Sequence, residues 1–118
     1  MTESDLQASI VSSLRKLGYT VLSTSARVSR GIRGVTKGLP DLMVTHRSWE
    51  TGIWLGLEVK LPKGAIKPEQ KELLEAGRIV VVRSWDDAWR AVLGKGDTVR
   101  KPNDPDYPDS IITVRVTN

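Results

Sequence analysis

The chain has 118 residues, no cysteine, one histidine and a formal net charge of +4. This length predicts one compact domain with its own hydrophobic core. The lack of cysteine excludes disulfide bonds, thiolate catalysis and cysteine-ligated zinc, and the single histidine, His46, argues against a serine–histidine–acid triad or a histidine-rich metal site. Any bound metal would therefore be held by carboxylates, and such hard oxygen ligands suit Mg²⁺ or Mn²⁺.

The excess of 18 lysines and arginines over 14 acidic residues is a mild bias toward polyanionic partners. The sequence has neither a basic N-terminal flank followed by an apolar stretch nor an apolar run of membrane-spanning length. We therefore expect a cytoplasmic protein without a membrane partner, located in the host cytoplasm if the protein is viral.

The first predicted element is an amphipathic helix over residues 3–17. Apolar residues recur at spacings of four, four and three: Leu6, Ile10, Leu14 and Leu17. Thr2 can cap the start of this helix, and Gly18 can end it. At about 100° per residue, Glu3 falls in the middle of the apolar stripe. A carboxylate at the buried edge of a helix needs a partner or a metal.

Three strands are predicted next, over residues 19–24, 41–45 and 52–60. Between the first two, residues 27–37 carry four cations and no acidic residue, interleaved with glycines: Arg27, Arg30, Arg33 and Lys37. Because glycine lets the backbone approach a partner closely, this segment is a candidate phosphate-binding loop for DNA. The alternative is a solvated connection between strands.

Charged side chains interrupt these apolar strands. Asp41 follows Gly-Leu-Pro at the start of the second strand, and Glu58 and Lys60 lie in the third. Side chains alternate along a strand, so Glu58 and Lys60 emerge on one face, roughly 6.6 Å apart, while the opposite face stays apolar. If the two strands are neighbours about 4.8 Å apart, Asp41 and Glu58 can share one metal ion.

A short second helix of two turns is predicted, with Pro68 near its first position and Gly77 just past its end. On this helix Gln70 shares a face with Leu73 and Leu74, so we expect its amide to point inward. Residues 78–84 then form an apolar, β-branched run, which predicts a central strand covered on both faces.

The last predicted helix is capped by Ser84 and ended by Gly94. Residues 95–110 are rich in proline, glycine and charge and predict an irregular surface segment. Residues 111–117 alternate as a strand would, and such a strand can pair with a free sheet edge or with a second subunit. We therefore divide the chain into a core, residues 1–94, and a C-terminal extension, residues 95–118.

Each polar feature also has a structural explanation. Glu3 can complement the helix dipole, and Pro40 and Asp41 can simply form a turn before the strand. An isolated Glu-x-Lys is common on strands. The joint order favours a functional site: an inward Glu, a Gly-x-Pro-Asp at a strand start, a Glu-x-Lys on the next strand and an inward Gln on the next helix.

That order resembles the PD-(D/E)xK nuclease superfamily and, more narrowly, its VRR-NUC domain, the virus-type replication-repair nuclease module. The matching stretches lie within residues 3–93 and read ESDLQASIVSSLRKLGY, KGLPDLMV, LGLEVKLPKGAIKPEQKELLEAG and IVVVRSWDDAWRAVL. The resemblance implies an α/β fold with a restriction-endonuclease-like αβββαβ core, in which helices flank a mixed central sheet.

The resemblance also implies roles for individual residues. The implied catalytic residues are Glu3, Asp41, Glu58, Lys60 and Gln70. Mg²⁺ or Mn²⁺ would be bound by Asp41, Glu58, the backbone carbonyl of Val59 and, to complete the site, Glu3. Lys60 would orient or help deprotonate the attacking water and stabilise charge on the phosphate, and Gln70 would support the active site.

The function implied by the resemblance is metal-dependent hydrolysis of DNA by a homodimer that acts on branched DNA, including Holliday junctions. Alternatives are a flap or general DNA nuclease and a DNA-binding module that keeps the fold without catalysis. A metal-free interaction protein is a third hypothesis, with four tryptophans as contact residues: Trp49, Trp54, Trp85 and Trp89. The family also suggests DNA repair and a phage or other mobile-element origin.

Overall fold

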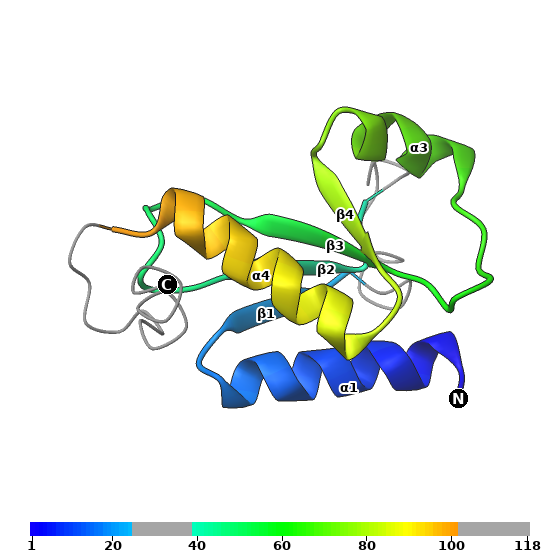
Figure 1. Cartoon of the computed structure of the whole chain (residues 1–118), viewed down its shortest axis with the longest axis horizontal. Helices are drawn as coiled ribbons and strands as arrows, with labels where there is room; N and C mark the ends of the chain where they lie inside the picture. The colour runs from blue at the N-terminus through cyan, green and yellow to red at the C-terminus, as the bar shows by residue number, and fades with distance from the viewer. Residues whose placement is uncertain (25–38, 102–118) are drawn as a thin grey trace, which may run out of the picture.

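The computed structural model describes residues 1–24 and 39–101. In these two ranges the protein is an α/β structure with one four-stranded mixed sheet and three helices (Figure 1). None of these helices is long and apolar enough to cross a membrane. The elements in chain order are α1 (Glu3–Lys16), β1 (Thr20–Ser23), β2 (Leu42–Thr45), β3 (Leu55–Val59), α3 (Pro68–Glu75), β4 (Ile79–Val82) and α4 (Trp85–Val99).

The structure confirms the predicted order of helices and strands and the mixed sheet. Two predicted features lie outside the described residues. One is the strand over residues 111–117, and the other is the candidate phosphate-binding loop with Arg27, Arg30, Arg33 and Lys37.

Helix α1 begins at the predicted Glu3 and ends at Lys16, one residue before the predicted Leu17. The Thr2 hydroxyl accepts a hydrogen bond from the Asp5 N–H at 3.1 Å, and the Asp5 carboxylate accepts one from the Thr2 N–H at 3.0 Å, so the first turn carries a capping box. Gly18 follows the helix with φ of 93°, a conformation that favours glycine. The buried residues of α1 are Leu6, Ile10 and Leu14.

The strands lie in the order β1-β2-β3-β4, with antiparallel pairing from β1 to β3 and parallel pairing between β3 and β4. Leu42 of β2 pairs with Leu57 of β3, which confirms that the strands of Asp41 and Glu58 are neighbours. Helices α1 and α4 contact each other and both contact β3. Leu57 and Val59 join the core there, which leaves Gly56 and Glu58 on the opposite face of β3.

Strand β4 lies at one end of the four-stranded order, so the prediction of a central strand is wrong for the described part of the sheet. Ile79 and Val82 of this strand are buried and Val80 and Val81 are partly buried, and both α3 and α4 contact the strand. The apolar, β-branched run therefore accompanies packing against two helices and does not require a central position in the sheet.

Helix α4 runs to Val99, so the predicted end at Gly94 is wrong. Its start is as predicted, because the Ser84 hydroxyl accepts a hydrogen bond from the Asp87 N–H at 3.1 Å. Gly94 is exposed and costs only about 1 kcal/mol of helix propensity, whereas the next turn buries Gly96. The predicted boundary between residues 94 and 95 therefore falls inside α4.

Three of the four tryptophans pack in the core or against it. Trp49 is 2% exposed, and Trp85 and Trp89 stack on each other with ring centroids 5.9 Å apart while packing against the core. Trp54 is the exposed one, at 37%. These residues therefore contribute mainly to packing, which weakens the hypothesis of a tryptophan-based interaction surface.

Gly56 leaves the space in which Pro40 packs. A Cβ atom at Gly56 would lie 2.9 Å from Cγ of Pro40 and 3.1 Å from Cγ2 of Ile79. On its other side the segment before β2 is tied to Thr24, whose hydroxyl donates to the Pro40 carbonyl and whose N–H donates to the Asp41 carbonyl at 2.9 Å. The position of Asp41 thus depends on a glycine in the neighbouring strand.

We predict that Gly56→Ala destabilises the protein by about 1–3 kcal/mol, because the added methyl group meets a rigid proline ring in a packed site. Gly94→Ala is the control, since no heavy atom lies within 4 Å of its new Cβ atom. This control should leave stability unchanged or raise it by up to about 1 kcal/mol. Urea unfolding of both variants tests the prediction, and equal midpoints for the two would contradict it.

Candidate functional site

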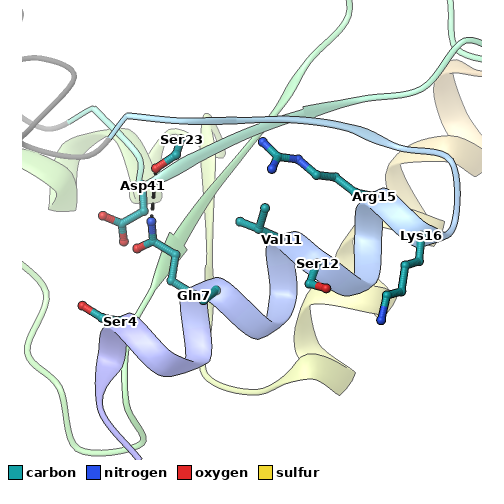
Figure 2. Close-up of a pocket in the computed structure, with 9 residues that line it drawn as sticks. Ser4, Gln7, Val11, Ser12, Arg15, Lys16, Ser23 and Asp41 are labelled. Atoms are coloured by element: carbon teal, nitrogen blue, oxygen red, sulfur yellow. Dashed lines mark hydrogen bonds between the residues drawn. The ribbon is translucent and has the colours of Figure 1, made fainter.

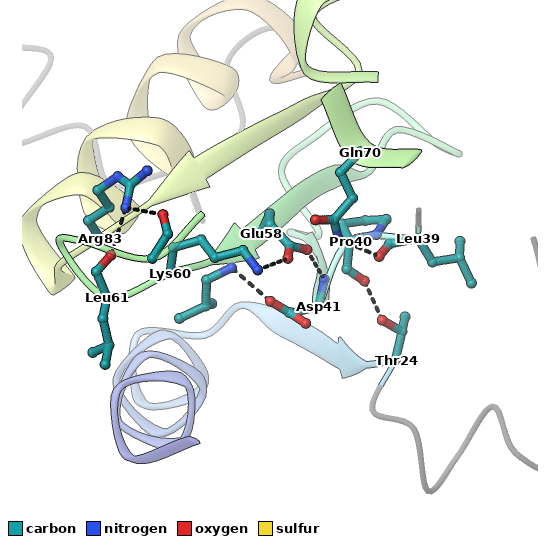
Figure 3. A network of polar contacts seen from close by, with 11 residues as sticks. Thr24, Leu39, Pro40, Asp41, Glu58, Lys60, Leu61, Gln70 and Arg83 are labelled. Atoms are coloured by element: carbon teal, nitrogen blue, oxygen red, sulfur yellow. Dashed lines mark hydrogen bonds and ion pairs between the residues drawn. The ribbon is translucent and has the colours of Figure 1, made fainter. Parts of the chain in front are cut away.

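Asp41 and Glu58 are joined by reciprocal hydrogen bonds between β2 and β3 (Figure 3). The Asp41 N–H donates to Oε1 of Glu58 at 3.2 Å, and the Val59 N–H donates to Oδ2 of Asp41 at 2.9 Å. Each carboxylate is therefore fixed by a backbone amide at or next to the other acidic residue. The structure brings these two residues together as the sequence predicted.

Lys60 completes a polar group that we call the acid–lysine cluster, made of Asp41, Glu58 and Lys60. Nζ of Lys60 lies 3.3 Å from Oε2 of Glu58, and both side chains are buried. The Lys60 N–H donates to the carbonyl of Val82 at 3.0 Å, so β4 fixes the backbone beneath the ammonium group. Lys60 and Glu58 therefore share one face of β3, as strand alternation predicted.

Gln70 reaches the cluster from α3, which confirms the predicted inward orientation. Its side chain is 5% exposed, and Nε2 makes a long hydrogen bond of 3.5 Å to the Leu39 carbonyl. Oε1 of Gln70 is buried and has no hydrogen-bond partner among the described residues. Such an orphaned acceptor needs explaining, and a carboxamide oxygen can accept from water or bind a hard cation.

The pKa of the Glu58 carboxyl group is raised above its ordinary value, first by burial and then by the negative charge of Asp41. Hydrogen bonds from Gln70 and Lys60 and the charge of Lys60 act in the opposite direction but do not cancel the rise in pKa. The acid–lysine cluster thus holds two carboxylates against one ammonium group. A bound cation would relieve this excess of negative charge.

The two carboxylates fit a Mg²⁺ or Mn²⁺ ion, because such ions often use one or two protein carboxylates and keep several waters. Within residues 1–24 and 39–101, no three histidine, aspartate or glutamate side chains are grouped as a metal site. Glu3 is therefore not grouped with Asp41 and Glu58. The predicted carbonyl ligand at Val59 stays a prediction, since the contact seen here uses its N–H.

Glu3 is partly exposed and lies one turn before Leu6, the first buried residue of α1. Glu3 thus lies at the same angle around the helix as the apolar residues, but in a turn that the core does not cover. One α1 side chain that lines the same groove as Asp41 is Gln7, whose Nε2 donates to the Ser23 hydroxyl at 3.3 Å (Figure 2). Gln7 was not identified from the sequence. The only signal for it is that residues four apart share a helix face, so Gln7 lies on the same face as Glu3.

Arg83 holds the loop that follows Lys60. Its Nη1 donates to the carbonyls of Leu61, Gly64 and Pro62 at 2.6, 3.0 and 3.2 Å. The Arg83 N–H in turn donates to the Asp87 carboxylate at 2.9 Å. One guanidinium group therefore fixes the chain direction directly after the acid–lysine cluster, and nothing in the sequence pattern pointed to it.

No protein-family model, curated protein or solved structure matches the chain. The fold and the site define an α/β protein with a buried pair of carboxylates and a lysine on adjacent strands of a mixed sheet. The function is therefore inferred from this geometry together with the order of motifs in the sequence.

We predict that the stability difference between the wild type and Glu58→Gln depends on pH. Because the folded state raises the pKa of Glu58, its contribution to stability is fully present below the ordinary value of 4.5 and is lost as the pH rises through the raised value. The wild type should therefore lose stability relative to the variant across that window. Urea unfolding in EDTA at a series of pH values measures the difference.

Glu72→Gln, which changes an exposed carboxylate on α3, is the matched control and should track the wild type. A constant difference between the wild type and Glu58→Gln at every pH would show that the pKa of Glu58 is not raised by folding.

We also predict that Arg83→Met destabilises the protein by about 1–3 kcal/mol, because it leaves three carbonyl groups without their donor. Arg90→Met is the control, since Arg90 pairs with Asp86 at 2.9 Å on the surface, where both side chains are exposed. Such surface pairs contribute little to stability. Thermal unfolding compares the two variants, and a similar small change in both would contradict the role of Arg83.

Proposed function

We propose that the protein is a metal-dependent nuclease that hydrolyses phosphodiester bonds in DNA. The observation that carries the proposal is the acid–lysine cluster. The Glu58 carboxylate accepts a hydrogen bond from the Asp41 N–H, the Asp41 carboxylate accepts one from the Val59 N–H, and Nζ of Lys60 lies 3.3 Å from Oε2 of Glu58. The αβββαβ order and the mixed sheet are compatible with a restriction-endonuclease-like core. The same residues carry the resemblance to the PD-(D/E)xK nucleases.

The energetics of the cluster support a functional role. Burying charged groups costs desolvation energy, and well-packed apolar residues often give equal or greater stability at such positions. Glu58 and Lys60 are 2% and 6% exposed, yet the sequence keeps both charges. A carboxyl group with a raised pKa beside a second carboxylate is typical of sites that bind metals or transfer protons.

The residues have separable tasks in the proposed reaction. Asp41 and Glu58 would hold Mg²⁺ or Mn²⁺, which when bound supplies charge neutralisation and lowers the pKa of water. Lys60 would orient the attacking water and place positive charge beside the phosphate. Gln70 would hold the Glu58 carboxyl group through its amide and accept a hydrogen bond at Oε1.

We further propose, from the family resemblance, that the substrate is branched DNA and that a homodimer cuts four-way junctions. A two-fold dimer presents two equivalent sites, which suits symmetric cutting of two strands. Flap cleavage or general nuclease activity is the alternative within the same chemistry.

A non-catalytic DNA-binding module is the second candidate function. One observation favours it: the described residues do not group a third carboxylate with Asp41 and Glu58. Metal-dependent cleavage distinguishes the two candidates, because the non-catalytic module would bind DNA without cutting it.

We predict that the wild type cuts labelled DNA in Mg²⁺ or Mn²⁺ and does not cut it in EDTA. Asp41→Asn and Lys60→Met should each lower the rate by roughly 100-fold or more, as expected for groups that position and activate water. Arg90→Met, an exposed change on α4, should leave the rate unchanged. The assay compares a four-way junction, a flap and a linear duplex.

Full activity of Lys60→Met, or cutting in EDTA, would overturn the proposed mechanism. Symmetric nicking of the junction would support junction resolution, whereas cutting confined to linear duplex would exclude it. Binding without cutting under every condition would establish the non-catalytic module.

A further inference from the structure

A groove of about 720 Å³ runs along α1 and reaches Asp41 (Figure 2). We call it the α1 groove. Its polar lining comes from α1 and the end of β1: Ser4, Gln7, Ser12, Arg15, Lys16 and Ser23. Asp41 is the one acidic residue among the described residues that line the groove. The groove therefore has a carboxylate near Gln7 and two cations toward the other end of the helix.

The cation end of the α1 groove is held in place. Nη2 of Arg15 donates to the Val21 carbonyl at 2.8 Å, which fixes the guanidinium against β1 while the side chain as a whole stays exposed. A guanidinium has five N–H donors, so this bond leaves donors for a ligand. Their planar arrangement matches phosphate oxygens. Lys16 is exposed beside Arg15 and adds a second positive charge.

The spacing of these groups suits a nucleic acid strand. Gln7 and Lys16 lie roughly 14 Å apart along the helix axis, because each residue of an α-helix rises about 1.5 Å. This length exceeds the axial rise of one nucleotide in a DNA duplex, about 3.4 Å, so the groove can contact more than one phosphate of a strand. Hydroxyl and amide groups such as those of Ser12 and Gln7 are common contacts to phosphate and sugar.

We infer that the α1 groove binds the sugar–phosphate backbone of one DNA strand whose cleaved phosphate lies at Asp41, and that Arg15 and Lys16 contact another phosphate of the same strand. The inference rests on the proposed function, because it takes the DNA bound at Asp41 as its starting point. Its contacts read no bases, so the strand is bound without sequence preference.

The test measures binding of fluorescent single-stranded and duplex DNA by anisotropy in EDTA, where no metal-dependent cutting occurs. Ser12→Glu places a negative charge at an exposed position in the groove lining. Ser9→Glu carries the same charge on an exposed residue of α1 outside the groove lining. We expect Ser12→Glu to weaken binding more than Ser9→Glu does, with equal urea midpoints for the two.

Lys16→Gln gives an independent readout. Losing one phosphate contact should reduce the slope of log K against log salt by about 0.7 for single strands or about 0.9 for duplex. Equal binding by Ser12→Glu and Ser9→Glu together with an unchanged slope in Lys16→Gln would overturn the inference, whether or not the protein cuts DNA. Groove-dependent binding by a protein that never cuts DNA would support the groove and reject the nuclease.

Discussion

The reciprocal hydrogen bonding between Asp41 and Glu58 is the constraint on which the rest of the site depends. Each carboxylate is fixed by a backbone amide at or beside the other residue, so the pair forms only when β2 and β3 lie in the observed antiparallel register. A shift of one residue would turn Glu58 to the other face of the sheet. The register that pairs Leu42 with Leu57 in the core therefore also assembles the polar site.

The surrounding structure limits the cost of this buried charge. Thr24 and Gly56 position the chain before Asp41, while Val82 and Arg83 hold the backbone at Lys60 and the loop after it. None of these four residues carries the chemistry we propose. They keep the three charged groups of the acid–lysine cluster close together. Because these groups are already held in place, they need no further ordering when substrate binds.

The sequence predicted those features of the site that follow from periodicity and failed where tertiary packing decides. Strand alternation placed Glu58 and Lys60 on one face, and helical spacing turned Gln70 inward. Gly94 is a local stop signal, but packing of the next turn continued α4 to Val99. An angle on a helical wheel could not show where along α1 the core ends, and the long-range contacts of Arg83 with the loop after Lys60 have no periodic signature.

The span from Glu58 to Arg83 carries the glutamate, the lysine, the glutamine and the arginine that holds the loop, whereas Asp41 directly precedes β2. The site is therefore complete only while β2 stays on β3. Because β2 and β3 are the inner strands of the described sheet and Leu42, Val44 and Leu57 are fully buried, opening this strand pair needs nearly as much free energy as unfolding the whole domain. The global stability of the domain therefore limits the population able to act, and a substitution that destabilises the core lowers this population without changing any charged group.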